Sequence, residues 1–188
     1  MGVDLSASQL ERARQKATMD NLQINFQKHD ARDLPFRQEF DLVIMLCEGG
    51  FSLMETDEMN YRILRNASSA LKPKGKLIFT TLNALFPLFH SVKDFLDANT
   101  KEGNAKCVGI SFDLMTFREQ NTVQAEDDFG NKKELHCNER YYTPPEITWM
   151  LKTLDFHAID IFGAKLGAFS RNDKLSAEDF EMLVIAER

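Results

Sequence analysis

The residues that decide the fold open the chain, as Gly2-Val3-Asp4-Leu5-Ser6. A short apolar stretch ends there in an acid, and Ser6 suits the N-cap of a helical pattern that runs to Ala17. We therefore expect a strand that ends at Asp4 and turns directly into a helix. An acid at this position accepts hydrogen bonds from ribose hydroxyls in nucleoside sites, and the same residue type also caps helices. Both interpretations of Asp4 stay open.

The next segments repeat this alternation of strand and helix. Leu22, Ile24 and Phe26 alternate with polar residues, which predicts a second strand. The near-continuous apolar run Phe40–Cys47 is typical of a strand buried on both faces, as parallel strands are. The pattern continues with a helix that Thr56 or Asp57 caps and that carries apolar residues from Met59 to Leu71. A strand at Lys76–Leu82 completes it. This order predicts an α/β fold with a mostly parallel sheet and helices on both of its faces.

The second half of the chain is less regular. Turn residues at 127–131 predict an antiparallel hairpin between Ser111–Phe117 and Leu135–Tyr142, and we expect residues 99–142 to form an insertion or lid on a single domain, 1–188. The remaining expected elements are helices at 84–98 and from Thr143 to Leu154, and strands at Ala158–Phe162 and Glu181–Ala186.

Charge and composition narrow the function. The chain has 188 residues, with 23 Lys and Arg against 29 Asp and Glu, a net charge of −6. This balance favours a small-molecule partner over nucleic acid or an anionic membrane. The sequence contains neither a transmembrane-length apolar run nor a signal-peptide pattern, which predicts a cytoplasmic protein. The cysteines Cys47, Cys107 and Cys137 form no CxxC pair, so we expect no disulfide and no metal site.

A second acid follows the second expected strand. Asp30 is followed by Ala31, whose backbone amide carries no bulky side chain beside it. Such a pair can read an adenine edge, because the carboxylate accepts from the exocyclic amine while the amide donates to a ring nitrogen. Taken alone, Asp30 is also consistent with a solvated loop acid.

Four segments in this order and spacing resemble the class I S-adenosylmethionine-dependent methyltransferases, whose sheet is Rossmann-like. They are Gly2–Ser6, Asp30–Phe36, Phe40–Ile44 and Leu71–Leu77. Each is weak alone, and the resemblance covers nearly the whole chain, because Tyr142–Glu146 and Leu154–Phe156 are similar to the late helix and strand of the family.

The resemblance implies S-adenosylmethionine as the cofactor. Asp4 is then expected to hold the ribose diol, and Leu5 to pack against the adenine. Asp30 and Ala31 are expected to read the adenine edge. Leu46 and Cys47 are expected beside the methionine portion and the reactive methyl group.

The same resemblance places the acceptor near Glu48–Phe51. Glu48 is the acid nearest the expected methyl position. It either accepts a proton or orients an amine there, or it is a loop acid without a catalytic role. Phe51, His90, Tyr142 and Arg171 are the candidate substrate-binding residues, although a lone His on an apolar helix is usually a packing residue.

One part of the family pattern has no counterpart in this sequence. In the family, a central strand and a glycine-rich loop precede the segment that Met1 opens here, and the fold is therefore expected to be truncated at its first strand. We expect the strands at Val3 and Leu42 to pair with each other or across a homodimer, since unpaired buried amides are costly.

Two function classes follow. The first is a methyltransferase that acts on a small-molecule acceptor with an incomplete cofactor site. The alternative is a non-catalytic methyltransferase-like module for binding or oligomerisation. A nicotinamide-dependent oxidoreductase ranks last, because it also needs the GxGxxG loop and gives no reason for the Asp30-Ala31 pair.

Overall fold

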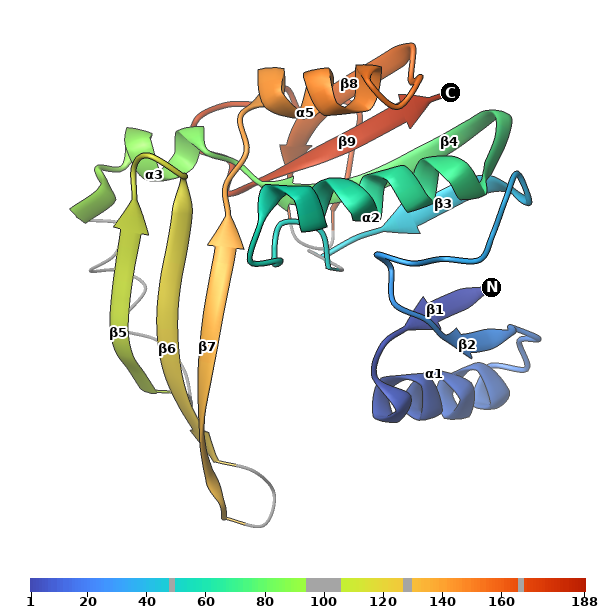
Figure 1. Cartoon of the computed structure of the whole chain (residues 1–188), viewed down its shortest axis with the longest axis horizontal. Coiled ribbons are helices and arrows are strands. Elements are labelled where there is room, and N and C mark those ends of the chain that lie inside the picture. The colour runs from blue at the N-terminus through green and yellow to red at the C-terminus, as the bar shows by residue number, and fades with distance from the viewer. Residues whose placement is uncertain (48–49, 94–105, 127–129, 166–167) are drawn as a thin grey trace.

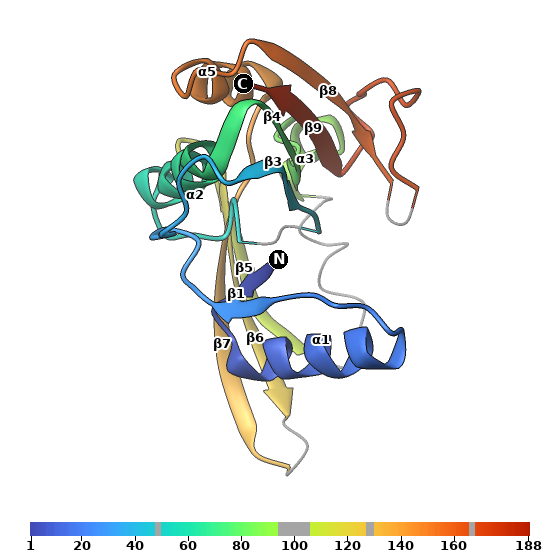
Figure 2. The same cartoon turned by 90° about the vertical axis from the view of Figure 1, so that its right-hand side faces the viewer.

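The computed structural model (Figures 1 and 2) describes residues 1–47, 50–93, 106–126, 130–165 and 168–188. Strand β1 (Gly2–Asp4), helix α1 (Ala7–Met19) and strand β2 (Phe26–Lys28) form the first unit. The two strands pair in parallel, as the sequence predicted, with Gly2 opposite Phe26. Ser6 is the N-cap of α1, and its hydroxyl accepts a hydrogen bond from the amide of Gln9. The expected strand from Leu22 is shorter, because β2 begins only at Phe26.

A second, four-stranded sheet has the order β3-β4-β9-β8. Strands β3 and β4 pair in parallel, whereas β4–β9 and β8–β9 pair antiparallel. The sheet is therefore mixed, and the expectation of a mostly parallel sheet is not confirmed. The elements of this unit are β3 (Phe40–Met45), α2 (Asp57–Ala70), β4 (Leu71–Leu82), α5 (Pro144–Lys152), β8 (Ala158–Ala164) and β9 (Glu181–Glu187).

The insertion is a three-stranded antiparallel sheet with the order β5-β6-β7, whose strands are Lys106–Asp113, Arg118–Glu126 and Lys132–Arg140. The predicted hairpin is wrong in its pairing, because β6 lies between the two segments that were expected to be partners. Residues 118–126 read REQNTVQAE and contain almost no apolar alternation, so nothing in the sequence marked them as a strand. The expected helix at 84–98 is the short helix α3 (Leu85–Phe89), and residues 94–98 lie outside the described part.

The main core lies between the four-stranded sheet and helices α2 and α5, which cover the same face of it (Figures 1 and 2). The amphipathic pattern of α2 explains this placement, since Ile63, Leu64 and Ala67 recur on one side of the helix and are all buried. Val43 and Met45 of β3 pack against this core, but Leu42 and Ile44 alternate to the other face and are 44% and 56% exposed. The expectation that β3 is buried on both faces is therefore wrong for this edge strand.

Strands β1 and β3 do not pair with each other among the described residues: β1 pairs with β2, and β3 with β4. Their facing edges line a cavity of about 260 Å³, to which β1 contributes Val3 and β3 contributes Leu42–Ile44. The predicted direct pairing of these strands is therefore wrong. Pairing across a homodimer stays a prediction, as does the division of the chain into a single domain with a lid.

Helix α5 provides a local test of how the sequence sets element boundaries. The hydroxyl of Thr143 accepts from the amide of Glu146 at 3.4 Å, and the Glu146 carboxylate accepts from the amide of Thr143 at 2.7 Å, which forms a capping box. Thr143→Ala should lower the free energy of unfolding by about 1 kcal/mol, measured by urea denaturation. Thr143→Ser keeps the oxygen and should lie close to the wild type; an equal loss in both variants would contradict the capping role.

Candidate functional site

A cavity of about 420 Å³ opens where strands β1 and β2 end. The ends of these strands and the segments after them contribute Asp4, Leu5, Asp30 and Ala31, and the loop before α2 contributes Gly50 and Met54. Four residues that sequence reasoning assigned to one cofactor thus lie around one cavity. Figure 1 shows why, since neighbouring parallel strands bring their carboxyl ends to one edge of the sheet.

The carboxylate of Asp4 is held by a tight local turn. Its Oδ1 accepts from the amide of Ser6 at 2.7 Å, and Ser6 in turn caps α1. The capping interpretation of Asp4 is therefore wrong, because Ser6 caps α1 and Asp4 binds the amide of the cap residue instead of an amide of the first helical turn. A carboxylate has two oxygens with two lone pairs each, so this turn leaves acceptor capacity for a diol. Leu5, which is 59% exposed, supplies an apolar surface beside it.

The carboxylate of Asp30 is paired with the guanidinium of Arg32. Oδ1 accepts from the backbone amide and from Nε of Arg32 at 2.8 and 2.9 Å, and Oδ2 accepts from a terminal nitrogen of Arg32 at 2.6 Å. These hydrogen bonds lower the pKa of Asp30 to about 2, so the group stays ionised at neutral pH. Sequence reasoning missed Arg32, although a basic residue two positions after an acid in a turn is a readable signal. An adenine amine must share this carboxylate with Arg32.

The residues expected beside the methyl group are not among the described lining residues of this cavity. Leu46 is half-buried and Cys47 is exposed, and neither belongs to the described lining of the cavity, which takes Gly50 from this loop instead. The backbone of Cys47 is in the left-handed region, with φ of 54°. Glu48 lies outside the described residues.

Of the candidate substrate-binding residues, Phe51 and Tyr142 are fully buried in the main core. Their rings stack with centroids 5.2 Å apart, and Asn60 donates a hydrogen bond to the Tyr142 hydroxyl at 3.1 Å. Burial raises the pKa of this hydroxyl, so it remains protonated. His90 is exposed after α3 with its ring 4.4 Å from that of Phe86, and Arg171 is exposed in the loop between β8 and β9.

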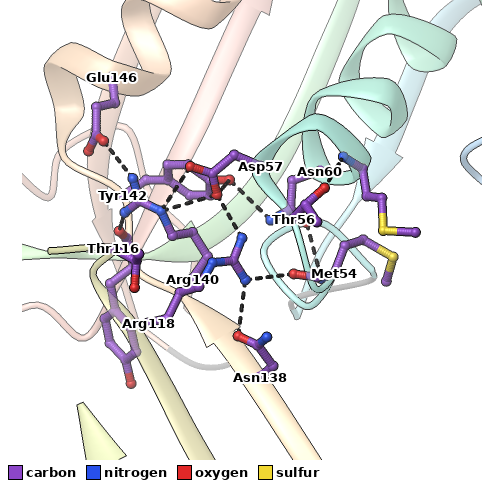
Figure 3. Close-up of polar contacts among 12 residues, drawn as sticks. Met54, Thr56, Asp57, Asn60, Thr116, Arg118, Asn138, Arg140, Tyr142 and Glu146 are labelled. Carbon is purple, nitrogen blue, oxygen red and sulfur yellow. Dashed lines mark hydrogen bonds and ion pairs between the residues drawn. The ribbon is translucent and has the colours of Figure 1, made fainter. Parts of the chain in front are cut away.

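A charged cluster that sequence reasoning missed joins the loop before α2 to the three-stranded sheet (Figure 3). Arg118 and Arg140 are directly opposite each other on β6 and β7 and are 7% and 6% exposed. Asp57, at the start of α2, accepts from Arg118 at 2.7 Å and from Nε of Arg140 at 3.3 Å. Glu146 pairs with Arg140 at 2.7 Å. We call these four residues the Asp57 cluster.

The Asp57 cluster reaches the cavity through Met54. The backbone carbonyl of Met54 accepts a hydrogen bond from the Arg118 guanidinium at 2.7 Å, and the backbone amide of Met54 donates one to Asn60 Oδ1 at 3.2 Å. The next residue, Glu55, also lines the cavity. The buried Arg118 side chain therefore holds the wall of the cavity that the loop before α2 supplies.

Known proteins resemble this chain in sequence and in fold. The family model described as "Methyltransferase domain" matches residues 1–75. Ubiquinone biosynthesis O-methyltransferase of Coxiella burnetii is 33% identical over 89 residues, which are 47% of this chain and 36% of that protein. A solved S-adenosylmethionine-dependent methyltransferase from Clostridium acetobutylicum superposes with a TM-score of 0.71 at 17% identity, over 98% of this chain and 73% of that one. The first 75 residues of the chain thus match a methyltransferase domain, and the chain shares the fold of solved methyltransferases.

Another solved methyltransferase gives the same architecture. CcbJ from Streptomyces caelestis superposes with a TM-score of 0.69 at 16% identity, over 98% of this chain and 72% of that one. Several of the solved proteins with this fold are S-adenosylmethionine-dependent methyltransferases. The chain spans about a third of the length of the curated relatives it matches. None of its described helices combines the length and apolar character that a membrane-spanning helix requires.

The Asp57 cluster gives a prediction for stability. Asp57→Asn leaves Arg118 without its carboxylate partner in a nearly buried position, and we expect a loss of roughly 3 kcal/mol in the free energy of unfolding. The matched control is Asp41→Asn, which breaks an exposed ion pair with Lys72 and should cost less than about 1 kcal/mol. Urea denaturation of both variants decides the matter, and similar losses would contradict a structural role for the cluster.

The Asp30–Arg32 pair gives a prediction for titration. The carboxyl carbon of Asp30, followed by nuclear magnetic resonance, should titrate near pH 2 in the wild type. In Arg32→Gln the charge and the side-chain hydrogen bonds are lost, so the midpoint should rise toward the ordinary value of 3.8. Because the native pKa is lowered, the pair stabilises the fold above pH 4, and this stabilisation is lost as the pH falls toward 2. A wild-type midpoint near 3.8 would show that the pair does not form in solution.

Proposed function

We propose that this chain binds S-adenosylmethionine and transfers its methyl group to a small-molecule acceptor. The observation that carries the proposal is the cavity at the ends of β1 and β2, around which Asp4, Leu5, Asp30 and Ala31 lie. Two carboxylates at adjacent strand ends, together with an apolar side chain in the same cavity lining, suit the diol, the amine and the flat ring of an adenine nucleoside.

Each of these residues has a defined part in binding. Asp4 accepts hydrogen bonds from the ribose hydroxyls through the oxygen that the Ser6 turn leaves for it. Asp30 accepts from the exocyclic amine of adenine, and the amide of Ala31 donates to a ring nitrogen. Leu5 packs against the ring. Arg32 keeps Asp30 ionised and fixes its orientation, so that the carboxylate presents acceptors only.

Methyl transfer itself requires fewer protein groups than binding of the cofactor does. The cofactor supplies an activated methyl group on a sulfonium, so that alignment of the acceptor contributes much of the rate. Leu46 and Cys47, which follow β3, are proposed to lie along the methionine portion. Glu48 is the proposed residue for orienting the acceptor or accepting its proton.

The acceptor residues proposed from the sequence are Phe51, His90, Tyr142 and Arg171. Phe51 and Tyr142 are stacked inside the core, so an acceptor reaches them only if the loop before α2 moves. His90 and Arg171 are exposed and need no such movement. The Coxiella burnetii relative is named an O-methyltransferase, which is compatible with a small-molecule acceptor for this chain.

The second candidate is a non-catalytic methyltransferase-like module for binding or oligomerisation. The cavity between β1 and β3 favours it, because two strand edges with exposed apolar residues face each other there without pairing. A second copy of the chain that closes this gap is the proposed partner, and sedimentation equilibrium measures whether a dimer forms. Nucleic acid is not a proposed partner, and a cytoplasmic location stays a prediction.

Calorimetric titration of the chain with S-adenosylmethionine and with S-adenosylhomocysteine tests the proposal. Hydrogen bonds to a charged group contribute roughly 1.5–3 kcal/mol each, so Asp4→Asn should weaken S-adenosylhomocysteine binding at least about tenfold. Asp20→Asn, at the far end of α1, is the matched control and should bind like the wild type. If a folded wild-type chain shows no saturable binding of either compound, the non-catalytic module is the better description.

A further inference from the structure

A groove of about 960 Å³ lies between helices α2 and α5, on the side of both helices that solvent reaches. The two helices cover the same face of the four-stranded sheet (Figures 1 and 2). The groove shares no described lining residue with the cavity at the ends of β1 and β2 or with the cavity between β1 and β3. It is therefore a feature that the proposed function does not use.

Polar contacts hold the two walls of the groove together. At one end, Arg140 pairs with Asp57 of α2 at 3.3 Å and with Glu146 of α5 at 2.7 Å. Further along, the hydroxyls of Tyr61 and Thr153 share a hydrogen bond of 2.8 Å. The groove is thus formed within the folded chain and needs no partner to open it.

The groove contains residue types that protein interfaces favour. Trp149, the only tryptophan of the chain, is 66% exposed, and Tyr61, Met150 and Arg65 are also in the lining. Tryptophan, tyrosine, methionine and arginine are enriched at the centres of interfaces, and tryptophan and arginine often carry much of the binding energy. A groove of this composition is typical of a surface that another protein covers.

The charges of the groove are of two kinds. Asp57 and Glu146 are paired with the buried arginines of the Asp57 cluster, so their charge is compensated within the chain. Glu58 and Arg65 are exposed, and neither side chain forms an ion pair or a hydrogen bond with any residue that the structure describes. These two charges are therefore available to another molecule.

Glu58 and Arg65 lie on one stripe of α2. Because an α-helix has about 3.6 residues per turn, they are about two turns apart on the same side, with Tyr61 and Arg62 between them. The stripe is acidic at its start and basic at its end. A second α2 helix that lies antiparallel across a two-fold axis places each Glu58 opposite the Arg65 of the other copy. The stripe is therefore complementary to a second copy of itself.

The middle of the stripe fits the same arrangement. In the register that pairs Glu58 with Arg65, Tyr61 of each copy lies opposite Arg62 of the other copy. A guanidinium over a tyrosine ring is attracted by the negative face of the ring. Each Arg62 thus meets an aromatic ring instead of a second arginine.

We propose that a second copy of this chain docks on the groove between α2 and α5, with the two α2 helices antiparallel around a two-fold axis. Glu58 of each copy pairs with Arg65 of the other, and Trp149 of each copy packs against the groove of the other. The self-complementary charges favour a second copy over an unrelated protein, whose surface has no reason to repeat the pattern in reverse. This interface differs from the gap between β1 and β3, where the second candidate function places a copy.

Trp149 provides a site-specific test, because the chain has no other tryptophan. Sedimentation equilibrium of the wild-type chain over a series of concentrations should show a monomer–dimer equilibrium. The tryptophan emission should shift to shorter wavelength over the same concentrations, because the exposed indole becomes buried. A chain that stays monomeric, or a dimer that forms without a shift of the emission, overturns the proposal.

Exchange of the two charges tests the antiparallel register. Glu58→Arg places two arginines opposite each other, and Arg65→Glu places two glutamates opposite each other. Each single variant should weaken dimerisation at least about tenfold, because the contact occurs twice in the dimer. The double variant Glu58→Arg with Arg65→Glu restores both pairs with reversed polarity and should dimerise like the wild type. A double variant as weak as the single variants overturns the proposed pairing.

Two control variants locate the interface. Glu178→Arg changes an exposed glutamate outside the groove, and Leu42→Ser changes the edge of β3 at the other cavity. Both should dimerise like the wild type. If Leu42→Ser abolishes the dimer while Glu58→Arg keeps it, the copies meet at the gap between β1 and β3 and the groove proposal is wrong.

Thermal unfolding checks that every variant folds. Should the charge variants fail to fold, Trp149→Ala takes their place, since its side chain is largely exposed in the single chain. Trp149→Ala should weaken dimerisation at least about tenfold, and wild-type dimerisation of this variant overturns the proposal.

The titration with S-adenosylhomocysteine separates this inference from the proposed function. If S-adenosylhomocysteine binds to a chain that stays monomeric, the groove inference is wrong while the methyltransferase proposal stands. If the chain dimerises with the expected shift of the emission but does not bind S-adenosylhomocysteine, the groove inference stands and the methyltransferase proposal is wrong.

Discussion

The Asp57 carboxylate is the interaction on which the arrangement of this chain depends. Two arginines lie directly opposite each other on β6 and β7, nearly buried, and their mutual repulsion needs a negative partner between them. Asp57 provides it from the first turn of α2, where a negative charge also interacts favourably with the helix dipole. One carboxylate thus joins the inserted sheet to the main sheet at the edge where the cavity at the ends of β1 and β2 opens.

This joint has a consequence for the candidate cofactor site. The loop from Gly50 to Glu55 leads into α2, and Arg118 holds it through the carbonyl of Met54. The opposite wall is set by local turns, in which Asp4 accepts from Ser6 and Asp30 accepts from Arg32. One wall of the cavity therefore depends on a long-range ion pair, whereas the other depends on contacts within two residues. Substitutions in the inserted sheet should therefore displace the wall formed by Gly50–Glu55 more than the wall formed by Asp4 and Asp30.

Local sequence signals were sufficient for much of the fold. Caps at Ser6, Thr56 and Thr143 fixed the starts of three helices, because a capping hydroxyl acts within three residues. Strand β6 was missed because its residues are polar, and it forms only because β5 and β7 hydrogen-bond to both of its edges. In the site, Asp4 and Asp30 were readable since Asp4 is the last residue of β1 and Asp30 lies two residues after the end of β2. The Asp57 cluster could not be predicted, because Asp57 is more than sixty positions from both Arg118 and Arg140 in the chain. Only the folded sheets bring these residues together.

Two acids of the chain differ in how their charge is compensated. Asp30 has a bidentate guanidinium, so it presents acceptor oxygens with little net charge, which suits a neutral ring amine. Glu119, on β6, is 2% exposed and accepts hydrogen bonds from the neutral side chains of Asn121 and Tyr141. Burial therefore raises the pKa of Glu119, whereas the guanidinium of Arg32 lowers that of Asp30. A carboxyl side chain is thus kept ionised at the strand ends, where acceptors are needed, and shifted toward its neutral form inside the inserted sheet.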